Sequence, residues 1–151
     1  MERIEKQPVD LNGKAILVTG AAGFIGSNLC KRLLRETTES VIVGIDCMTD
    51  YNPIELKEWR LKYIQETFEQ DGIDRKNQWI FVKADIADQA LINKLFNQYA
   101  FAVVVNLAAQ AGVRYSITNP EAYLHSNLIG FFNILEACRN DKNLEHLVYA
   151  S

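Results

Sequence analysis

Short apolar runs alternate with longer amphipathic segments along most of the chain. Five runs are rich in β-branched residues and nearly continuous in their hydrophobicity, which is typical of strands buried on both faces of a parallel sheet. The predicted strands cover residues 15–19, 41–45, 79–82, 103–105 and 147–149.

Every gap between these strands carries a helical pattern. Apolar residues recur at helix spacing in the segments that begin near Ile25, Asn52, Asp88 and Asn119. Asn52, Asp88 and Asn119 are predicted N-caps. A proline at the first helical position follows both Asn52 and Asn119. The predicted helices cover residues 25–34, 53–70, 89–96 and 120–139.

The order of elements predicts an α/β fold, namely a Rossmann-type doubly wound parallel sheet of five strands with flanking helices. Right-handed crossovers place such helices on both faces of the sheet. A ligand then binds beyond the carboxyl ends of the strands, at the switch point between the first and fourth strands.

Composition places the chain among single soluble domains. It has 151 residues, of which 48% are hydrophobic, and a formal net charge of −3 from 16 basic and 19 acidic residues. The acidic balance argues against a nucleic-acid partner. Residues 1–12 are expected to form a polar N-terminal extension, and residues 13–151 a dinucleotide-binding domain.

Targeting and metal signals are missing from the sequence. No apolar run is long enough to span a membrane, and the charged N-terminus is not a signal peptide. Three widely spaced cysteines, Cys30, Cys47 and Cys138, fit free thiols in a reducing cytoplasm, and we expect Cys30 and Cys138 to be buried. No cluster of histidine, cysteine and carboxylate residues suggests a metal.

A glycine-rich turn follows the first strand and opens the first helix. Gly20, Gly23 and Gly26 are spaced three apart, and each serves a different need: a tight turn, room for a pyrophosphate, and close packing of helix on sheet. The helix N-terminus then offers its N–H groups to the phosphates. The pattern predicts a dinucleotide phosphate site.

Carboxylates follow the next two strands. Asp46 ends the second strand, 20 residues after Gly26, where a carboxylate accepts the hydroxyls of the adenosine ribose and repels a 2′-phosphate. NAD is therefore favoured over NADP. Asp85, after the third strand, is placed to meet the adenine edge, and Asp88 is expected only to cap a helix.

Together these motifs resemble the extended short-chain dehydrogenase/reductase superfamily and, within it, the NAD-dependent epimerases and dehydratases of nucleotide sugars. The finer similarity is to the UDP-glucuronate 4-epimerase type, and it is carried by Asp46 to Tyr51, by Leu56-Lys57 and by Ala108 to Ser116. The resemblance covers about residues 14–151.

The resemblance implies roles for residues at matching positions. Cys47 stands where such proteins often carry asparagine. Arg114 and Tyr115 are expected on the pocket side, near the nucleotide sugar. The implied NAD contacts are Gly20, Gly23, Phe24, Ile25 and Gly26 for the pyrophosphate, Asp46 and Cys47 for the ribose, Asp85 and Ile86 for adenine, and Leu107, Ala108, Ala109, Gln110 and Asn127 towards nicotinamide.

The catalytic Tyr-x-x-x-Lys pair of such enzymes is not found in these 151 residues, because none of the six tyrosines has a lysine four residues later. We therefore assign no catalytic residue and expect an N-terminal fragment: the serine run beginning at Ser151 and the C-terminal substrate domain would follow it. The fragment alone is expected to be inactive. It is also expected to self-associate, through an apolar edge strand and the long helix after Asn119, as in a homodimer.

Two alternatives remain at this point. A nucleotide-sugar 4,6-dehydratase has the same cofactor-binding half as an epimerase. A non-catalytic NAD-binding sensor or scaffold module would need the cofactor site but no Tyr-x-x-x-Lys pair.

Overall fold

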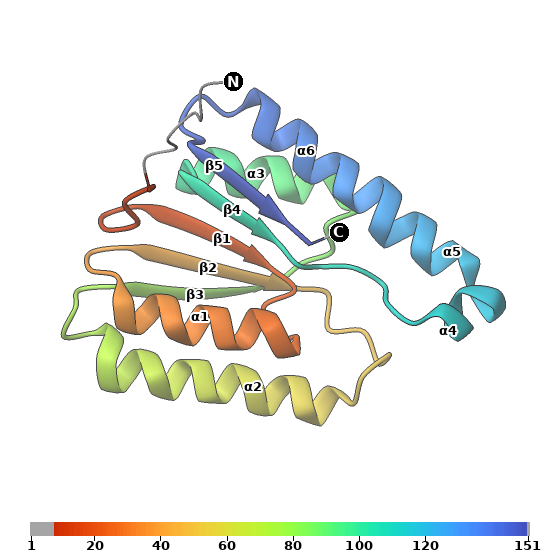
Figure 1. Cartoon of the computed structure of the whole chain (residues 1–151), viewed down its shortest axis with the longest axis horizontal. Helices are drawn as coiled ribbons and strands as arrows, with labels where there is room; N and C mark the ends of the chain where they lie inside the picture. The colour runs from red at the N-terminus through yellow and green to blue at the C-terminus, as the bar shows by residue number, and fades with distance from the viewer. Residues whose placement is uncertain (1–7, 151) are drawn as a thin grey trace, which may run out of the picture.

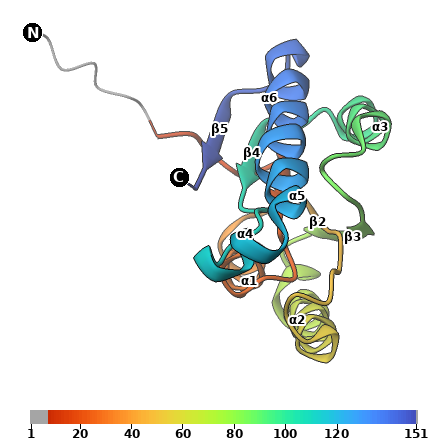
Figure 2. The same cartoon turned by 90° about the vertical axis from the view of Figure 1, so that its right-hand side faces the viewer.

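Five strands form a parallel sheet, and helices cover both of its faces (Figures 1 and 2). This computed structural model of the chain describes residues 8–150. The strand order is β3-β2-β1-β4-β5, so the order reverses between β1 and β4 and the predicted switch point is confirmed. The strands are β1 (Ala15–Thr19), β2 (Val41–Asp46), β3 (Gln78–Lys83), β4 (Val103–Asn106) and β5 (His146–Tyr149).

The helices connect successive strands. Two of the connections end or continue in π-helical stretches, which are written η. The helical elements are α1 (Phe24–Glu36), α2 (Ile54–Thr67), η1 (Phe68–Gly72), α3 (Gln89–Tyr99), α4 (Val113–Thr118), α5 (Pro120–Tyr123), η2 (Leu124–Gly130) and α6 (Phe131–Asn140).

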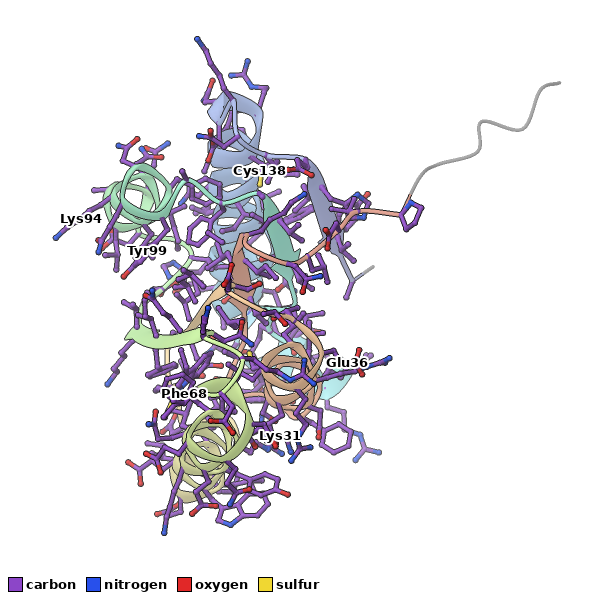
Figure 3. The ribbon with its side chains drawn as sticks, turned by 90° about the vertical axis from the view of Figure 1, so that its left-hand side faces the viewer. Lys31, Glu36, Phe68, Lys94, Tyr99 and Cys138 are labelled. Carbon is purple, nitrogen blue, oxygen red and sulfur yellow. The ribbon has the colours of Figure 1, made fainter. Side chains whose placement is uncertain are left out.

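Alternate residues of β1 supply two separate cores. Leu17 packs with residues of α3 and α6 on one face of the sheet, whereas Ile16 and Val18 pack with residues of α1 and α2 on the other. Cys138 and Phe68, both labelled in Figure 3, belong to these two opposite sides. Burial on both faces explains the continuous hydrophobicity of the strand sequences.

Two of the cysteines lie in these cores, as the sequence predicts. Burial raises the pKa of the Cys30 thiol to about 12 and that of Cys138 to about 11. Both thiols therefore stay protonated at neutral pH and pack as small apolar groups. Cys47 is exposed.

The long helix predicted after Asn119 differs from the structure in its middle. Asn119 caps it as predicted, since its side chain accepts from the Ala122 amide, and Asp88 likewise caps α3. The rod from α5 to α6, however, contains the π-helical η2 rather than an unbroken α-helix. The spacing of apolar residues carries no signal for that extra residue per turn.

One other local prediction was wrong, and one helix was not predicted. Asn52 does not cap α2; the helix begins one residue later, and the Pro53 carbonyl accepts from the Leu56 and Lys57 amides. Residues 113–118, for which the sequence predicted neither a strand nor a helix, form the short helix α4. Its two aliphatic side chains, Val113 and Ile117, are exposed, and the helix contacts the rest of the chain through Tyr115.

The ends of the described chain are partly packed. Val9 and Leu11 contact the core beneath α1, so this part of the expected polar extension touches the domain. Residues 1–7 and Ser151 lie outside the described part. β5 is an edge strand, as predicted, and Val148 and Tyr149 on it are 42% and 52% exposed.

A buried asparagine joins three elements at the amino-terminal edge of the sheet. The Asn77 amide donates to the carbonyls of Leu34 (3.1 Å) and Thr37 (2.9 Å), and its oxygen accepts from the Ser40 amide at 2.9 Å. Asn77 is only 4% exposed. It therefore fixes the end of α1 and the starts of β2 and β3 relative to one another.

We expect Asn77→Ala to lower the free energy of unfolding by about 2–4 kcal/mol, because it leaves buried backbone groups without partners. Asn140→Ala is the matched control, since Asn140 is exposed on α6 and bonds only locally; its effect should stay within about 0.5 kcal/mol. Urea unfolding of both variants measures the difference, and equal losses would contradict the role given to Asn77.

Candidate functional site

A cavity opens at the carboxyl ends of the strands, at the switch point between β1 and β4. Residues at or just after the ends of β1, β2, β3 and β4, from the β2–α2 connection and from η2 surround it. Its lining consists of Gly20, Gly23, Ile45, Asp46, Cys47, Thr49, Tyr51, Asn52, Lys57, Ala84, Asp85, Ile86, Leu107, Ala108, Ala109, Gln110 and Ser126. Ten of the predicted site residues are therefore brought together, while Phe24, Ile25, Gly26 and Asn127 lie outside this lining.

The glycine turn brings α1 against the end of β1. Gly20 has φ +69°, a conformation that favours glycine, and a Cβ there would lie 3.0 Å from the Ala108 amide nitrogen. A Cβ on Gly26 would lie 2.1 Å from the Gly20 carbonyl oxygen. The turn thus places the first N–H groups of α1 at the cavity, while the side chains of Phe24 and Ile25 point to solvent with 73% and 64% exposed.

Thr19 joins β1 to the loop that follows β4. Its hydroxyl donates to Asn106 Oδ1 at 2.7 Å and accepts from the amides of Leu107 (3.1 Å) and Ala108 (3.0 Å). Thr19 is fully buried. Because parallel strands diverge at the switch point, this hydroxyl supplies partners that a continued strand pairing would have given the two amides.

Asp46 lies in a buried ion pair that sequence reasoning missed. Lys57, one turn into α2, donates to Asp46 Oδ1 at 3.1 Å, and both side chains are less than a tenth exposed. The Met48 amide donates to the same oxygen and the Ala22 amide to Oδ2. Lys57 appeared in the sequence only as part of a motif, with nothing to show that it faces Asp46.

This arrangement limits what Asp46 can still accept. A carboxylate has about four acceptor positions, and the three donors above occupy three of them. The sequence predicted that Asp46 accepts from both ribose hydroxyls, but its carboxylate has room for only one further donor. Lys57 retains further N–H donors at the cavity wall and can serve the second hydroxyl oxygen.

The loop after β4 is held from η2. Asn127 Oδ1 accepts from the Gln110 amide at 2.8 Å, and its Nδ2 donates to the Gln110 carbonyl at 3.0 Å. Asn127 thus binds the backbone of Gln110, which lines the cavity, while Asn127 itself does not line it. Its neighbour Ser126 is part of the lining.

Three tyrosines fix the end of the same loop. Tyr51 and Tyr115 lie with ring centroids 5.1 Å apart, and the Tyr123 hydroxyl donates to the carbonyls of Ala111 (2.8 Å) and Gly112. Burial, together with the nearby Tyr51 and Tyr115, raises the pKa of Tyr123, so its hydroxyl stays a donor.

Two further residues singled out in the sequence lie around this tyrosine cluster. Tyr51 lines the cavity, while Tyr115 packs behind it and Arg114 is exposed on α4. Arg114 and Tyr115 thus lie outside the lining of this cavity, and their expected place near the nucleotide sugar stays a prediction.

The wall formed after β3 carries Asp85 and Ile86. Asp85 Oδ1 accepts from the Ala87 amide at 2.8 Å, and Oδ2 lies 2.8 Å from His125 Nε2. Ile86 is 4% exposed. His125 was not expected at the site, because it is 40 residues from Asp85 in the sequence.

Two other classes of site were checked in the described part of the chain. Residues 8–150 contain no group of three or more histidine, cysteine, aspartate or glutamate side chains that could hold a metal ion. Within the same range, no helix has both the length and the apolar character needed to cross a membrane.

We expect Thr19→Val to lower the free energy of unfolding by about 2–4 kcal/mol, since the Leu107 and Ala108 amides lose their acceptor. Thr19→Ser keeps the hydroxyl and should cost only about 1 kcal/mol for the lost methyl group. Hydrogen exchange of the two amides gives the local measure: faster exchange in the valine variant alone is expected, and equal exchange in both variants would refute the link.

Comparison with known proteins agrees with this geometry. The family model described as GDP-mannose 4,6 dehydratase matches residues 17–151. Protein CapI of Staphylococcus aureus is 45% identical over 136 residues, which are 90% of this chain and 37% of that protein. UDP-glucuronate 4-epimerase 2 of Arabidopsis thaliana is 41% identical over 140 residues, 93% of this chain and 30% of that protein. The chain thus spans about a third of the length of these relatives.

Solved structures show the same fold. A variant of UDP-glucuronic acid 4-epimerase from Bacillus cereus, in complex with NAD and a fluorinated UDP-glucuronic acid, is 33% identical with a TM-score of 0.73; the match covers 89% of this chain and 39% of that one. UDP-glucose 4-epimerase from Thermus thermophilus, in complex with NAD, is 29% identical with a TM-score of 0.67, covering 91% and 37%.

The predicted resemblance to nucleotide-sugar epimerases and dehydratases is therefore confirmed. The matched family model covers nearly the whole chain, from the middle of β1 to its last residue. The chain belongs to the GDP-mannose 4,6 dehydratase family.

Proposed function

We propose that this chain is the NAD-binding part of a nucleotide-sugar epimerase that acts on UDP-glucuronate at C4. The observation that carries the proposal is the cavity at the switch point, where a glycine turn, a helix N-terminus and the Asp46 carboxylate meet. Relatives described as UDP-glucuronate 4-epimerases support the substrate.

The residues present fit a dinucleotide. Gly20 and Gly23 leave the cavity wall without side chains beside the start of α1, and Gly26 lets that helix approach the strand end. The pyrophosphate would lie there against backbone N–H groups, including those of Phe24 and Ile25, and the positive end of the helix dipole favours its charge.

The adenosine half would occupy the side of the cavity formed by β2 and β3. Asp46 accepts one ribose hydroxyl, and Lys57 donates to the other ribose oxygen. Cys47 lies beside them at the rim, while Ile86 offers an apolar surface to the adenine ring and Asp85 accepts from its amino group.

The nicotinamide half would extend towards β4. Ala108 and Ala109 have small side chains that let a ring lie close to the strand end, between Leu107 and Gln110. Asn127 keeps Gln110 in place through two backbone hydrogen bonds. When bound, NAD supplies a hydride acceptor for the sugar carbon and returns the hydride afterwards.

A nucleotide-sugar 4,6-dehydratase is the second candidate, because the matched family model carries that description. Both reactions begin with oxidation at C4 and need the same cofactor cavity. The UDP-sugar would approach from the side of Tyr51 and α4, near Arg114. Dimer formation through the rod of α5, η2 and α6 also belongs to this proposal, and Leu128 and Phe132 on it are 63% and 55% exposed.

We expect the chain to bind NAD and to discriminate against NADP, because the Asp46 carboxylate repels a 2′-phosphate. Asp46→Asn leaves the Lys57 ammonium beside the ribose and should shift the NAD-to-NADP affinity ratio towards NADP by roughly tenfold or more. Titration calorimetry with both dinucleotides measures the ratio.

Asp50→Asn is the matched control, since Asp50 is exposed in the same connection and does not line the cavity. It should leave the ratio unchanged. The proposed cofactor site is wrong if the chain binds neither dinucleotide, or if both variants change the ratio equally.

The protein that carries this sequence should convert UDP-glucuronate into its C4 epimer with no change in mass. Chromatography coupled to mass spectrometry separates the outcomes, because a dehydratase forms a product lighter by one water. A product of that kind from a nucleotide sugar, without epimer, would favour the second candidate.

A further inference from the structure

The carboxylate of Asp85 is held in one orientation by donors on both of its oxygens. The Ala87 amide donates to Oδ1 at 2.8 Å, and His125 Nε2 lies 2.8 Å from Oδ2. Because an ionised carboxylate only accepts hydrogen bonds, the proton of this contact belongs to His125 Nε2, which carries it in the neutral as well as the charged ring.

His125 reaches Asp85 from outside the cavity. Asp85 and Ser126 line the cavity, whereas His125 does not, and its side chain is 54% exposed. The imidazole therefore contacts the carboxylate without itself forming part of the cavity lining. His125 is therefore placed to orient the Asp85 side chain and not to touch the ligand itself.

The helical rod that carries His125 is docked on the segment after β3. A Cβ on Gly130 would lie 2.5 Å from Ile86 Cγ1, so only glycine permits this approach. Asn133 is buried and donates to the carbonyls of Ile86 and Ala87, both at 3.0 Å. These contacts fix the distance between the two segments before any ligand binds.

The π-helical form of η2 explains how His125 and Gly130 share this side of the rod. Hydrogen bonds in a π-helix join residues five positions apart, and these two residues are five apart. In a regular α-helix the residues facing one neighbour are three or four apart. The π-helical geometry thus lets His125 face Asp85 while Gly130 packs against Ile86.

We propose that His125 is a positioning residue for recognition of the adenine base. It holds Asp85 Oδ2 so that the carboxylate presents one of its remaining acceptor positions to the exocyclic amino group of adenine. This role rests on the proposed function of the cavity as an NAD site. Without the imidazole, the half-exposed Asp85 side chain keeps only its local bond to the Ala87 amide and samples other rotamers.

The test compares NAD with nicotinamide hypoxanthine dinucleotide, in which an oxygen replaces the 6-amino group. His125→Ala should weaken NAD binding by about fivefold, the effect of one oriented hydrogen bond, and weaken binding of the analogue by less than about twofold. His125→Gln places an amide donor where Nε2 lies and should restore most of the preference for NAD. His146→Ala on the distant strand β5 is the matched control and should change neither affinity.

A double-mutant cycle separates action through Asp85 from a general effect on η2. In an Asp85→Asn background, His125→Ala should cost no further NAD affinity, because the group that it orients is gone. Additive losses would overturn the proposal, and so would equal losses for NAD and the analogue in His125→Ala. If His125→Ala binds both dinucleotides and keeps the wild-type preference for NAD over the analogue, the positioning role alone is refuted. If the wild-type chain binds neither dinucleotide, the proposed function and the positioning role are both refuted.

Discussion

The divergence of β1 and β4 at the switch point is the constraint on which the site depends. Two parallel strands that pair along their length must separate where their connections turn to opposite faces, and the backbone groups just beyond lose their partners. Thr19 satisfies the Leu107 and Ala108 amides with one hydroxyl, and Gly20 turns away immediately after it. A cavity can persist there because its floor is already hydrogen-bonded without a ligand.

A buried charge pair beside that floor is tolerated for a related reason. Removing Asp46 and Lys57 from water is costly, and their mutual attraction offsets the cost only when other partners complete the site. Two backbone amides, those of Ala22 and Met48, do so here. The first belongs to the glycine turn, so the carboxylate links the proposed ribose site to the proposed phosphate site, and Lys57 adds the start of α2 to the same unit.

The sequence predicted the features that follow from local chemistry. Strand positions, the caps at Asp88 and Asn119, the glycine turn and the carboxylates at the strand ends all depend on patterns a few residues long. Five of the proposed cofactor residues, Gly20, Gly23, Gly26, Asp46 and Asp85, were found this way, whereas the others came from the family resemblance. The contacts of Lys57, of His125 and of the helix at residues 113–118 were missed because each partner lies in a different element: Asp46, Asp85 and Tyr51, respectively. The spacing of apolar residues along the sequence does not indicate such a partner.

One short element braces two walls of the cavity. Three consecutive residues of η2 have separate tasks: His125 bonds to Asp85 after β3, Ser126 lines the cavity, and Asn127 grips Gln110 after β4. Consecutive helical residues point in different directions, so a single helical segment between two strand ends can contact both. The spacing between the proposed adenine and nicotinamide ends is thereby set by one helical rod, which the close approach of Gly130 and the bonds of Asn133 attach to the segment after β3.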